Sequence, residues 1–272
     1  GMKVITVDIG GTNIRHALVD GETLSVLHRG ANLPTPREDA RALSDSVIQG
    51  IQTIAHDLSG EKTIIAISSA GLVCPSDGSV IALSPEALPA LASRLPLQET
   101  VKAACAMPVY ILNDAQAATY GEYTAACKQH GTLENFMFVT VSTGTGGGFV
   151  LNGKLVQGKS GKAGHIGLAM LCDDTLVEDK TCGRFVERDS QKAALSAGVI
   201  AKMIANKVME LDLDAVSIGG GVALGVAGYV DLVREKLAAY DAVYQTEIYK
   251  AVLSDDAGLV GAAAYALRTM EH

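Results

Sequence analysis

Three glycine-rich stretches in this sequence combine small residues with groups that bind phosphate. They are DIGGTN, with Asp8, Gly10, Gly11, Thr12 and Asn13; STGTGGG, with Thr143, Gly144 and Thr145; and IGGG, with Gly219, Gly220 and Gly221. Glycine lets backbone N–H groups approach a ligand closely, and exposed N–H groups and hydroxyls bind phosphate oxygens. Because each stretch follows an apolar run that reads as a strand, we expect three phosphate- or nucleotide-binding turns at strand ends.

The position of Asp8 before the glycines indicates a metal ion. The sequence contains no GxxxxGK[ST] motif, so it lacks a P-loop. No GxGxxG opens a helix after the first strand, which disfavours a dinucleotide-binding fold. A carboxylate beside bound phosphates would repel them unless a cation intervenes. We therefore expect Asp8 to hold Mg²⁺, directly or through water, since Mg²⁺ favours oxygen ligands together with phosphates.

The first half of the chain must supply a sheet that positions these turns. KVITVDIGG and the runs on either side of Asp20-Gly21 predict a β-meander, because Asp-Gly is a common hairpin signal. Residues 35–58 predict a helix capped by Thr35, with Pro36 at its first position. Its apolar face is expected to be Leu43, Val47, Ile48, Ile51, Ile54 and Leu58. Residues 62–71 and 107–114 read as strands, with a helix at 96–106 between them.

The second half repeats this pattern. FMFVTVSTGTGGGFVLNGKLV reads as strand, glycine turn, strand, turn and strand, and AVSIGGG as a further strand with a glycine turn. Helices are expected at 190–212, 229–240 and 258–270. Two α/β lobes that face each other across a cleft follow from this internal similarity, with a boundary between residues 2–113 and 114–272. The last helix is expected to pack back on the first lobe.

Composition excludes several classes of protein. The 272 residues include 48% hydrophobic but only 4% aromatic residues and no Trp, so a core of Ala, Val, Leu and Ile is expected. The net charge of −8, without a basic block, argues against nucleic-acid or membrane-surface partners. No apolar run approaches the ~20 residues that cross a bilayer, and no secretory signal is present. Five cysteines without an export signal favour reduced thiols in the cytoplasm.

The motifs together resemble those of the ROK family of sugar kinases. DIGGTN, ILNDAQAATYGEY, FVTVSTGTGGGFVLNGKLVQG, GKAGHIG and DDAGLVGAAAYA carry the resemblance, which covers nearly the whole chain. Within the family the sequence is most similar to the branch that phosphorylates N-acetylmannosamine in sialic-acid breakdown. The resemblance implies an actin-like ATPase fold with two ribonuclease-H-like lobes and a central cleft. It also implies transfer of phosphate from ATP with Mg²⁺ to a sugar 6-hydroxyl, in a homodimer.

The resemblance assigns Asn113 and Asp114 to the sugar, with Asp114 as the residue that takes its proton. The chemistry supports this, because a positioned carboxylate that accepts a proton from a hydroxyl contributes about 10²- to 10⁴-fold in rate. An amide such as that of Asn113 both donates and accepts, which suits a sugar hydroxyl. The alternative is that Asp114 caps the helix AQAATYGEY, and the two roles are compatible.

Further sugar contacts are implied by matches outside the glycine turns. Ala70 and Gly71 in SSAGLV match a loop that lines the sugar in the family. His165 stands where the family has Glu, or His in the N-acetylmannosamine branch, and Glu187 matches a Glu that touches the sugar.

The sequence departs from the family at its zinc motif. The family pattern is C-x-C-G-x-x-G-C-x-E preceded by a histidine ligand, whereas Leu168 replaces that histidine here and only Cys182-Gly183 survives. Cys172 lies ten residues upstream of Cys182. A structural Zn²⁺ takes four ligands, mostly thiolate or imidazole, so we expect no zinc site.

Three other functions remain open from the sequence. The chain could phosphorylate glucose or another hexose. It could bind sugar without phosphorylating it, although intact Asp8, Asp114 and both phosphate turns favour an active enzyme. A transcriptional regulator is disfavoured, because ROK regulators carry a helix-turn-helix before the kinase-like part and the first strand here begins at Lys3.

Overall fold

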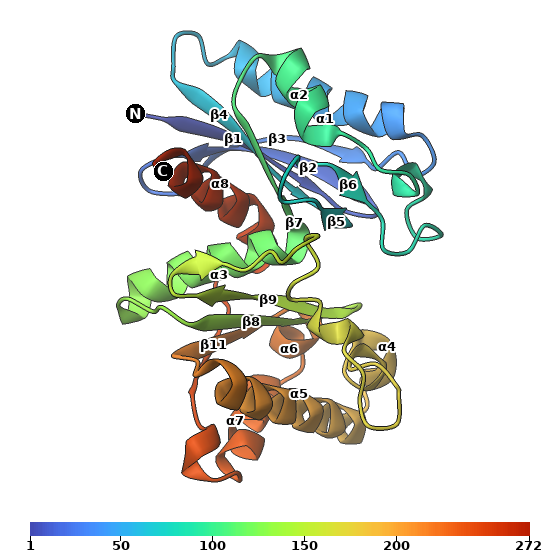
Figure 1. Ribbon diagram of the computed structural model, residues 1–272, viewed down its shortest axis with the longest axis vertical. Helices are drawn as coiled ribbons and strands as arrows, with labels where there is room; N and C mark the ends of the chain where they lie inside the picture. Colours follow the sequence, from blue (N-terminus) through green and yellow to red (C-terminus); the bar gives the residue numbers. More distant parts are fainter. The chain divides into compact units, whose positions relative to one another are not determined.

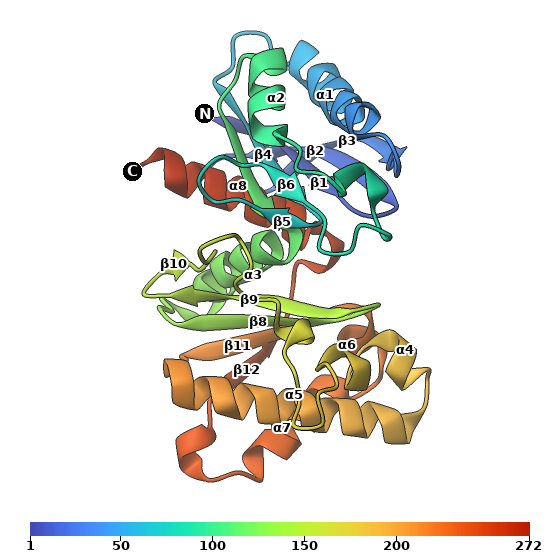
Figure 2. The same cartoon turned by 45° about the vertical axis from the view of Figure 1, so that its right-hand side comes forward.

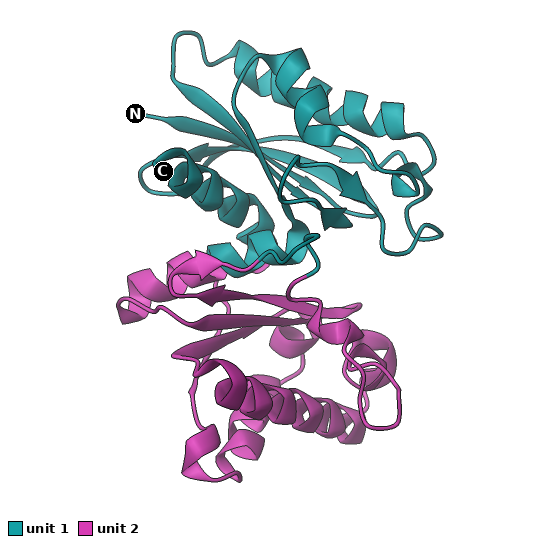
Figure 3. Ribbon diagram, viewed as in Figure 1, with its two compact units in different colours: residues 1–121, 157–162, 255–272 teal, residues 122–156, 163–254 magenta.

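The computed structural model describes all 272 residues, Gly1–His272 (Figure 1 and Figure 2). Contacts group them into two compact units (Figure 3). Unit 1 comprises residues 1–121, 157–162 and 255–272, and unit 2 comprises residues 122–156 and 163–254. Whether the units correspond to folding domains with a boundary between residues 113 and 114 stays a prediction. No helix is both long enough and apolar enough to span a membrane.

Unit 1 contains a five-stranded sheet of order β3-β2-β1-β4-β7. Its strands are β1 (Lys3–Ile9), β2 (Asn13–Asp20), β3 (Val26–Pro34), β4 (Thr63–Ser69) and β7 (Val109–Asn113). The first three form the predicted antiparallel meander, and β1, β4 and β7 run parallel. Strands β1 and β4 are continuous apolar runs because helices cover both of their faces. Helices α1 (Ala40–His56) and α2 (Leu97–Cys105) lie on one face and α8 (Ala257–Met270) on the other (Figure 1).

The predicted start of the first helix is wrong. Helix α1 begins at Ala40, and its N-cap is Asp39, whose carboxylate accepts hydrogen bonds from two backbone N–H groups of the first turn. Aspartate is among the strongest N-cap residues, so it outcompetes the signal from Thr35 and Pro36. Thr35 instead donates its hydroxyl to the carbonyl of Gly10 at 2.8 Å. The helix also ends at His56, so Leu58 lies beyond it.

Unit 1 also contains short elements that the sequence did not indicate. They are the two-stranded ladder of β5 (Leu72–Val73) and β6 (Val80–Ile81), and the 3-10 turn η1 (Pro89–Leu91). Helix α3 (Asp114–His130) follows β7 directly, and its first two turns belong to unit 1. The core between sheet and helices consists of aliphatic side chains, as the composition predicts; Ile5, Ile65, Leu43, Ile51 and Leu97 are all fully buried.

Unit 2 repeats the strand order of unit 1, as β10-β9-β8-β11-β12. The strands are β8 (Phe136–Val141), β9 (Thr145–Leu151), β10 (Lys154–Leu155), β11 (Ala215–Gly219) and β12 (Glu247–Lys250). Strands β8, β9 and β10 form an antiparallel meander, and β8, β11 and β12 run parallel. The predicted internal similarity is therefore present in the sheets. Only β12 was not predicted, since its four residues carry no clear alternation.

The helices of unit 2 include the predicted long pair. Helices α5 (Ser190–Leu211) and α7 (Tyr229–Ala238) pack against each other, and Asp189 caps α5. The other helices of unit 2 are short: η2 (Ile166–Leu168), η3 (Glu178–Lys180), α4 (Gly183–Val186), α6 (Gly221–Gly225) and η4 (Ala242–Tyr244). The 3-10 turn η5 (Ser254–Asp256) begins at the last residue of unit 2 and ends in unit 1. The core is again aliphatic, with Val139, Ile200, Ile204 and Val216 fully buried.

Helix α8 approaches helix α3 through glycine. A Cβ atom at Gly261 would overlap the carbonyl oxygen of Ala117 and lie 2.8 Å from the amide nitrogen of Gly121. Both obstacles are backbone atoms, so a larger residue could be accommodated only by moving one helix. Glycine in the last helix thus permits close packing of α8 against α3 within unit 1.

We expect Gly261→Ala to lower the free energy of unfolding by about 3 kcal/mol, the upper part of the usual cost of overpacking. Gly225→Ala is the matched control, because nothing lies within 4 Å of a Cβ there. It should change stability by no more than about 0.5 kcal/mol. Urea unfolding followed by circular dichroism measures both. Equal midpoints for the two variants would show that α8 and α3 are not in close contact.

Candidate functional site

Unit 1 brings several polar residues to one edge of its sheet. Strands β1, β4 and β7 are parallel neighbours, and their registers pair Ile9 with Ser69 and Ser69 with Asn113. The carboxyl ends of these strands therefore lie side by side, which is where open α/β sheets bind ligands. The turns that follow contain Gly10 and Gly11, Ala70 and Gly71, and Asp114.

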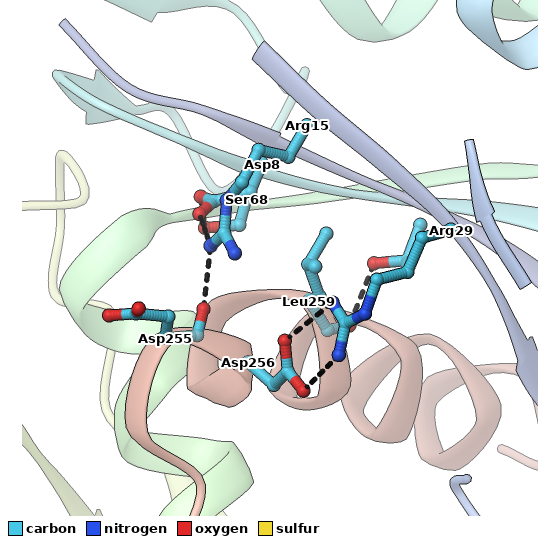
Figure 4. Close-up of polar contacts among 8 residues, drawn as sticks. Asp8, Arg15, Arg29, Ser68, Asp255, Asp256 and Leu259 are labelled. Carbon is cyan, nitrogen blue, oxygen red and sulfur yellow. Dashed lines mark hydrogen bonds and ion pairs between the residues drawn. The ribbon is translucent and has the colours of Figure 1, made fainter. Parts of the chain in front are cut away.

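The carboxylate of Asp8 is held from three elements (Figure 4). Its Oδ1 accepts a hydrogen bond from the hydroxyl of Ser68 at 2.9 Å, and its Oδ2 accepts one from Arg15 Nη2 at 2.7 Å. Arg15 also donates to the carbonyl of Asp255, directly before helix α8. In the first turn of that helix, a Cβ at Gly258 would lie 3.3 Å from Asp8 Oδ1. These contacts fix the orientation of Asp8 and stabilise its negative charge.

The turn of residues 10–13 directs its carbonyl groups into the protein. The amide of Gly10 donates to the carbonyl of Asn13 at 2.9 Å, and the amide of Thr35 donates to that of Thr12 at 2.8 Å. The hydroxyl of Thr35 and the guanidinium of Arg37 donate to the other two carbonyls of the turn. All four carbonyls are thus engaged, while residues 11–13 are exposed. An anion site needs this orientation, because outward carbonyl oxygens would repel phosphate.

Asn113 links the end of β7 to two neighbouring segments. Its Nδ2 donates to the carbonyl of Gly71 at 2.7 Å, and its Oδ1 accepts hydrogen bonds from the amides of Ala115 and Gln116. The residue that caps α3 is therefore Asn113, whereas the sequence suggested Asp114 as the alternative cap. Asp114 is the first residue of α3, and its Oδ1 accepts from the amide of Ala115 at 2.8 Å.

Asp114 has an unusual charge environment. Its side chain can be reached by solvent, yet the surrounding protein removes much of its hydration. This desolvation, followed by the negative charge of Asp8, raises the pKa of Asp114 from 3.8 to about 6, against the opposing effect of its hydrogen bonds. Two carboxyl groups whose surroundings differ in this way are typical of acid–base sites. Asp114 can therefore gain and lose a proton near neutral pH.

The residues around Asp8 fit a magnesium ion that keeps its own waters. Mg²⁺ usually binds one or two carboxylates together with water and substrate phosphates rather than a cage of protein ligands. Each oxygen of Asp8 already accepts one hydrogen bond and retains a lone pair for a water molecule. A cation near Asp8 would also relieve its repulsion of Asp114. Asp8 could hold Mg²⁺ through water.

Unit 2 brings the second and third glycine turns together. Strands β8 and β11 are parallel neighbours, and Gly219 pairs with Thr140. Residues 142–145, which we call phosphate loop 2, are closed by a hydrogen bond of 2.9 Å from the amide of Ser142 to the carbonyl of Gly144. Gly220 has a φ of 95°, and a Cβ there would overlap the carbonyl oxygen of Val141. Only glycine permits this approach of the third turn to the end of β8.

Within phosphate loop 2 the three predicted residues differ in exposure. Thr143 and Gly144 are exposed, whereas Thr145 is buried and its hydroxyl is bonded inside the unit to the hydroxyl of Thr181. The side chain of Thr145 therefore holds the loop in place.

His165 and Glu187 also belong to unit 2. His165 is half-buried and follows Gly164, whose positive φ of 94° brings the chain close to Gly148. Glu187 ends helix α4 in the left-handed conformation, with φ of 43°, and its side chain is 66% exposed, 4.0 Å from Lys192 Nζ. The structure brings the other predicted sugar residues, Ala70, Gly71, Asn113 and Asp114, together in unit 1.

The segment that should carry a zinc motif does not fit zinc. Cys172 is exposed, Cys182 is buried, and Leu168 is exposed in the place of the histidine ligand. No group of three or more His, Cys, Asp or Glu side chains converges anywhere in the chain to hold a metal ion.

Sequence reasoning missed Arg15 and Ser68, which hold Asp8. Both are direct sheet neighbours of Asp8, Arg15 on antiparallel β2 and Ser68 on parallel β4. Opposite charges that face each other across two strands are a known stabilising pair. The register of the Asp20-Gly21 hairpin could therefore have identified Arg15, whereas Ser68 required knowledge of the parallel pairing.

Comparison with known proteins places these features in a family. The sequence profile of the ROK family matches residues 4–186 and 186–269. The chain is 34% identical over 296 residues to an N-acetylmannosamine kinase of Haemophilus influenzae (strain PittEE), a match that covers 96% of this chain and 94% of that protein.

Solved structures agree with the sheet topology. A ROK hexokinase from Thermus thermophilus superimposes with a TM-score of 0.85 at 25% identity and full coverage of both chains. A ROK family glucokinase from Streptomyces griseus, solved in complex with glucose and AMPPNP, superimposes with a TM-score of 0.78 at 23% identity, covering 98% and 99% of the two chains. These likenesses confirm the predicted actin-like ATPase fold.

We expect Asp8→Asn to lower the pKa of Asp114, because the substitution removes the neighbouring negative charge while the desolvation of Asp114 remains. The midpoint should fall below 6 without reaching the ordinary value of 3.8. Carbon-13 NMR titration of labelled aspartate carboxyl groups measures the change. Asp45→Asn, on the exposed face of α1, is the control and should leave the midpoint in place. A midpoint that rises or stays constant in Asp8→Asn would contradict the electrostatic coupling.

Proposed function

This chain belongs to the ROK family, as its motifs predict, and we propose that it transfers the terminal phosphoryl group of ATP to the 6-hydroxyl of N-acetylmannosamine. The family profile and the 34% identity to an N-acetylmannosamine kinase, both over nearly the whole chain, support the kinase activity and its substrate. Such a reaction would serve sialic-acid breakdown. The proposed chemistry is supported by the position of Asp114 at the start of α3, after the end of β7, where desolvation and then the charge of Asp8 raise its pKa to about 6.

Asp114 acts as the general base. As the sugar O6 approaches the terminal phosphorus, its proton passes to the carboxylate of Asp114, a new P–O6 bond forms, and the bond to the oxygen of ADP breaks. A pKa of about 6 leaves Asp114 largely ionised at pH 7 and still able to hold the proton. Efficient general bases have a pKa near the working pH. Desolvation and the charge of Asp8 thus adapt an ordinary aspartate to this role.

The three glycine turns bind ATP. Gly10, Gly11, Thr12 and Asn13 contact phosphate through backbone N–H groups and hydroxyls, and so do Thr143 and Gly144. Thr145 supports phosphate loop 2 from inside unit 2, because its hydroxyl is bonded to Thr181 and its amide to Glu178. Gly219, Gly220 and Gly221 contact the adenosine part. The inward carbonyl groups of residues 10–13 and the close approach permitted by Gly220 support these roles. Phosphoryl transfer depends mainly on such positioning and charge stabilisation.

Asp8 holds magnesium through water in this proposal. When bound, Mg²⁺ neutralises charge that develops on the phosphate oxygens. Arg15 and Ser68 keep the carboxylate in one orientation, so that its position does not depend on the ligand.

Polar side chains and one loop are expected to bind the sugar. Asn113 Oδ1 caps α3, and its Nδ2 donates one hydrogen to the carbonyl of Gly71, which positions the loop of Ala70 and Gly71. The second hydrogen of Nδ2 can be donated to a sugar hydroxyl. His165 and Glu187 supply a ring nitrogen and a carboxylate for further hydroxyls.

The family resemblance also supports a homodimer, and the requirement for ATP supports a cytoplasmic location. The mass of the protein in solution tests the dimer.

Removal of the base should abolish turnover but retain sugar binding. We expect Asp114→Asn to lower kcat by about 10³-fold, within the usual range for a general base, while calorimetry still detects the sugar. In the unchanged protein, kcat/KM should fall tenfold per unit below pH 6, because protonated Asp114 accepts no proton. Asp45→Asn should match the unchanged protein. Turnover in Asp114→Asn equal to that of the control, or activity constant down to pH 5, would remove Asp114 from this role.

A panel of sugars decides the substrate. Coupled assays of ADP release should give a kcat/KM for N-acetylmannosamine at least tenfold above the values for glucose, mannose and N-acetylglucosamine. Phosphorus-31 and proton NMR of the product should place the phosphate at C6. A wide preference for glucose would assign the chain to the hexokinase branch of the family instead.

A further inference from the structure

A segment of unit 2 clamps phosphate loop 2 at three points. The amide of Gly183 donates to the carbonyl of Ser142 at 2.7 Å. The hydroxyls of Thr145 and Thr181 lie 2.7 Å apart, and Glu178 Oε1 accepts from the amide of Thr145 at 3.4 Å. Residues 178–183 therefore hold both ends of the loop, at its first carbonyl and at its last amide and hydroxyl.

The direction of each hydrogen bond in this network follows because a hydroxyl group has only one proton to donate. The hydroxyl of Thr181 donates its one proton to the carbonyl of Val177 at 2.9 Å, so the hydroxyl of Thr145 must donate to Thr181. Ser196 donates to the carbonyl of Thr181 at 2.9 Å, so Tyr229 must donate to Ser196, 2.7 Å away. Each hydroxyl proton then has one acceptor and none remains unsatisfied.

The network is almost completely buried. Thr181 and Ser196 are inaccessible to solvent, Tyr229 is 1% exposed and Thr145 is 8% exposed. Burial also raises the pKa of Tyr229 to about 12, so its hydroxyl keeps the proton that it donates. A buried and fully satisfied polar network is rigid, and loss of one member leaves its partners without hydrogen bonds. Phosphate loop 2 is thus connected to α5 and α7 through hydrogen bonds that water cannot replace.

This segment is the one in which the family pattern places its zinc motif, and its residues do not fit zinc. Cys172 and Cys182 differ in exposure, and no group of three metal-binding side chains converges. We propose that Thr145, Thr181, Ser196 and Tyr229 form a metal-free hydroxyl clamp that positions phosphate loop 2 for ATP, with Thr181 as the central positioning residue. The proposal rests on the proposed binding of ATP by this loop.

The clamp predicts a selective effect on nucleotide. Thr181→Val keeps the shape of the side chain but removes the acceptor of the Thr145 hydroxyl. We expect the dissociation constant of AMPPNP and the KM for ATP to rise about tenfold, as for a buried donor left unsatisfied. The KM for sugar should stay within twofold. Thr181→Ser restores the hydroxyl and should return both nucleotide constants to within threefold of the unchanged protein.

Two controls separate positioning from general destabilisation. Thr119→Val removes another fully buried hydroxyl, which donates to the carbonyl of Ala115 within α3, and should leave AMPPNP binding unchanged. Ser196→Ala breaks the clamp one step further from the loop and should raise the AMPPNP dissociation constant by a smaller factor. It provides the test if Thr181→Val does not fold. Metal analysis of the purified protein should find no stoichiometric zinc. Protein that has been treated with EDTA and then returned to a buffer with Mg²⁺ should bind AMPPNP as the untreated protein does.

Three results would overturn the clamp. They are unchanged AMPPNP affinity in Thr181→Val, an equal loss of sugar and nucleotide affinity, and stoichiometric zinc whose removal weakens AMPPNP binding. Calorimetry with AMPPNP needs no turnover, so these results differ from a failure of the proposed function. That failure would appear as absent phosphorylation of N-acetylmannosamine by a protein that still binds AMPPNP. A chain that binds no adenine nucleotide would contradict both proposals.

Discussion

The proposed chemistry depends on the desolvation of Asp114 and on its repulsion by Asp8, two carboxyl groups at one edge of the unit 1 sheet. Arg15 and Ser68 give Asp8 two hydrogen bonds and a positive partner, so its charge is stabilised. Asp114 has lost hydration and experiences the charge of Asp8, so protonation of Asp114 becomes easier. In the proposed reaction the two residues of one type thereby take different roles, with Asp8 held in place by Arg15 and Ser68 and Asp114 as the group that accepts the proton.

The strand order explains why these residues meet. In each unit a meander and two parallel strands place several carboxyl ends at one edge, although the residues concerned lie far apart in sequence. In unit 1 this edge holds the two carboxylates and Asn113, and in unit 2 it holds phosphate loop 2 and the third glycine turn. The same arrangement thus positions the two carboxyl groups and the first glycine turn in unit 1, and the other two glycine turns in unit 2.

Much of this could be predicted from the sequence, because apolar runs and glycine turns are local signals. The meander with its turn at Asp20-Gly21, the long helix α5 and the aliphatic core were all predicted from such signals. The start of α1 was predicted wrongly, since Thr35, Pro36 and Asp39 all offer a helix start. Asp39 caps the helix, and Thr35 bonds to Gly10, a contact distant in sequence. Asn113 as the cap and Thr181 as the partner of Thr145 depend on contacts distant in sequence or on exact geometry.

A crystal structure with N-acetylmannosamine and AMPPNP bound together would test the role of Asp114 as the general base. We expect O6 of the sugar to lie about 2.6–3.2 Å from a carboxylate oxygen of Asp114, the range from which a general base removes a proton. O6 should also face the terminal phosphorus. A well-ordered sugar whose O6 contacts a different acidic residue, with Asp114 directed away from it, would show that Asp114 is not the general base.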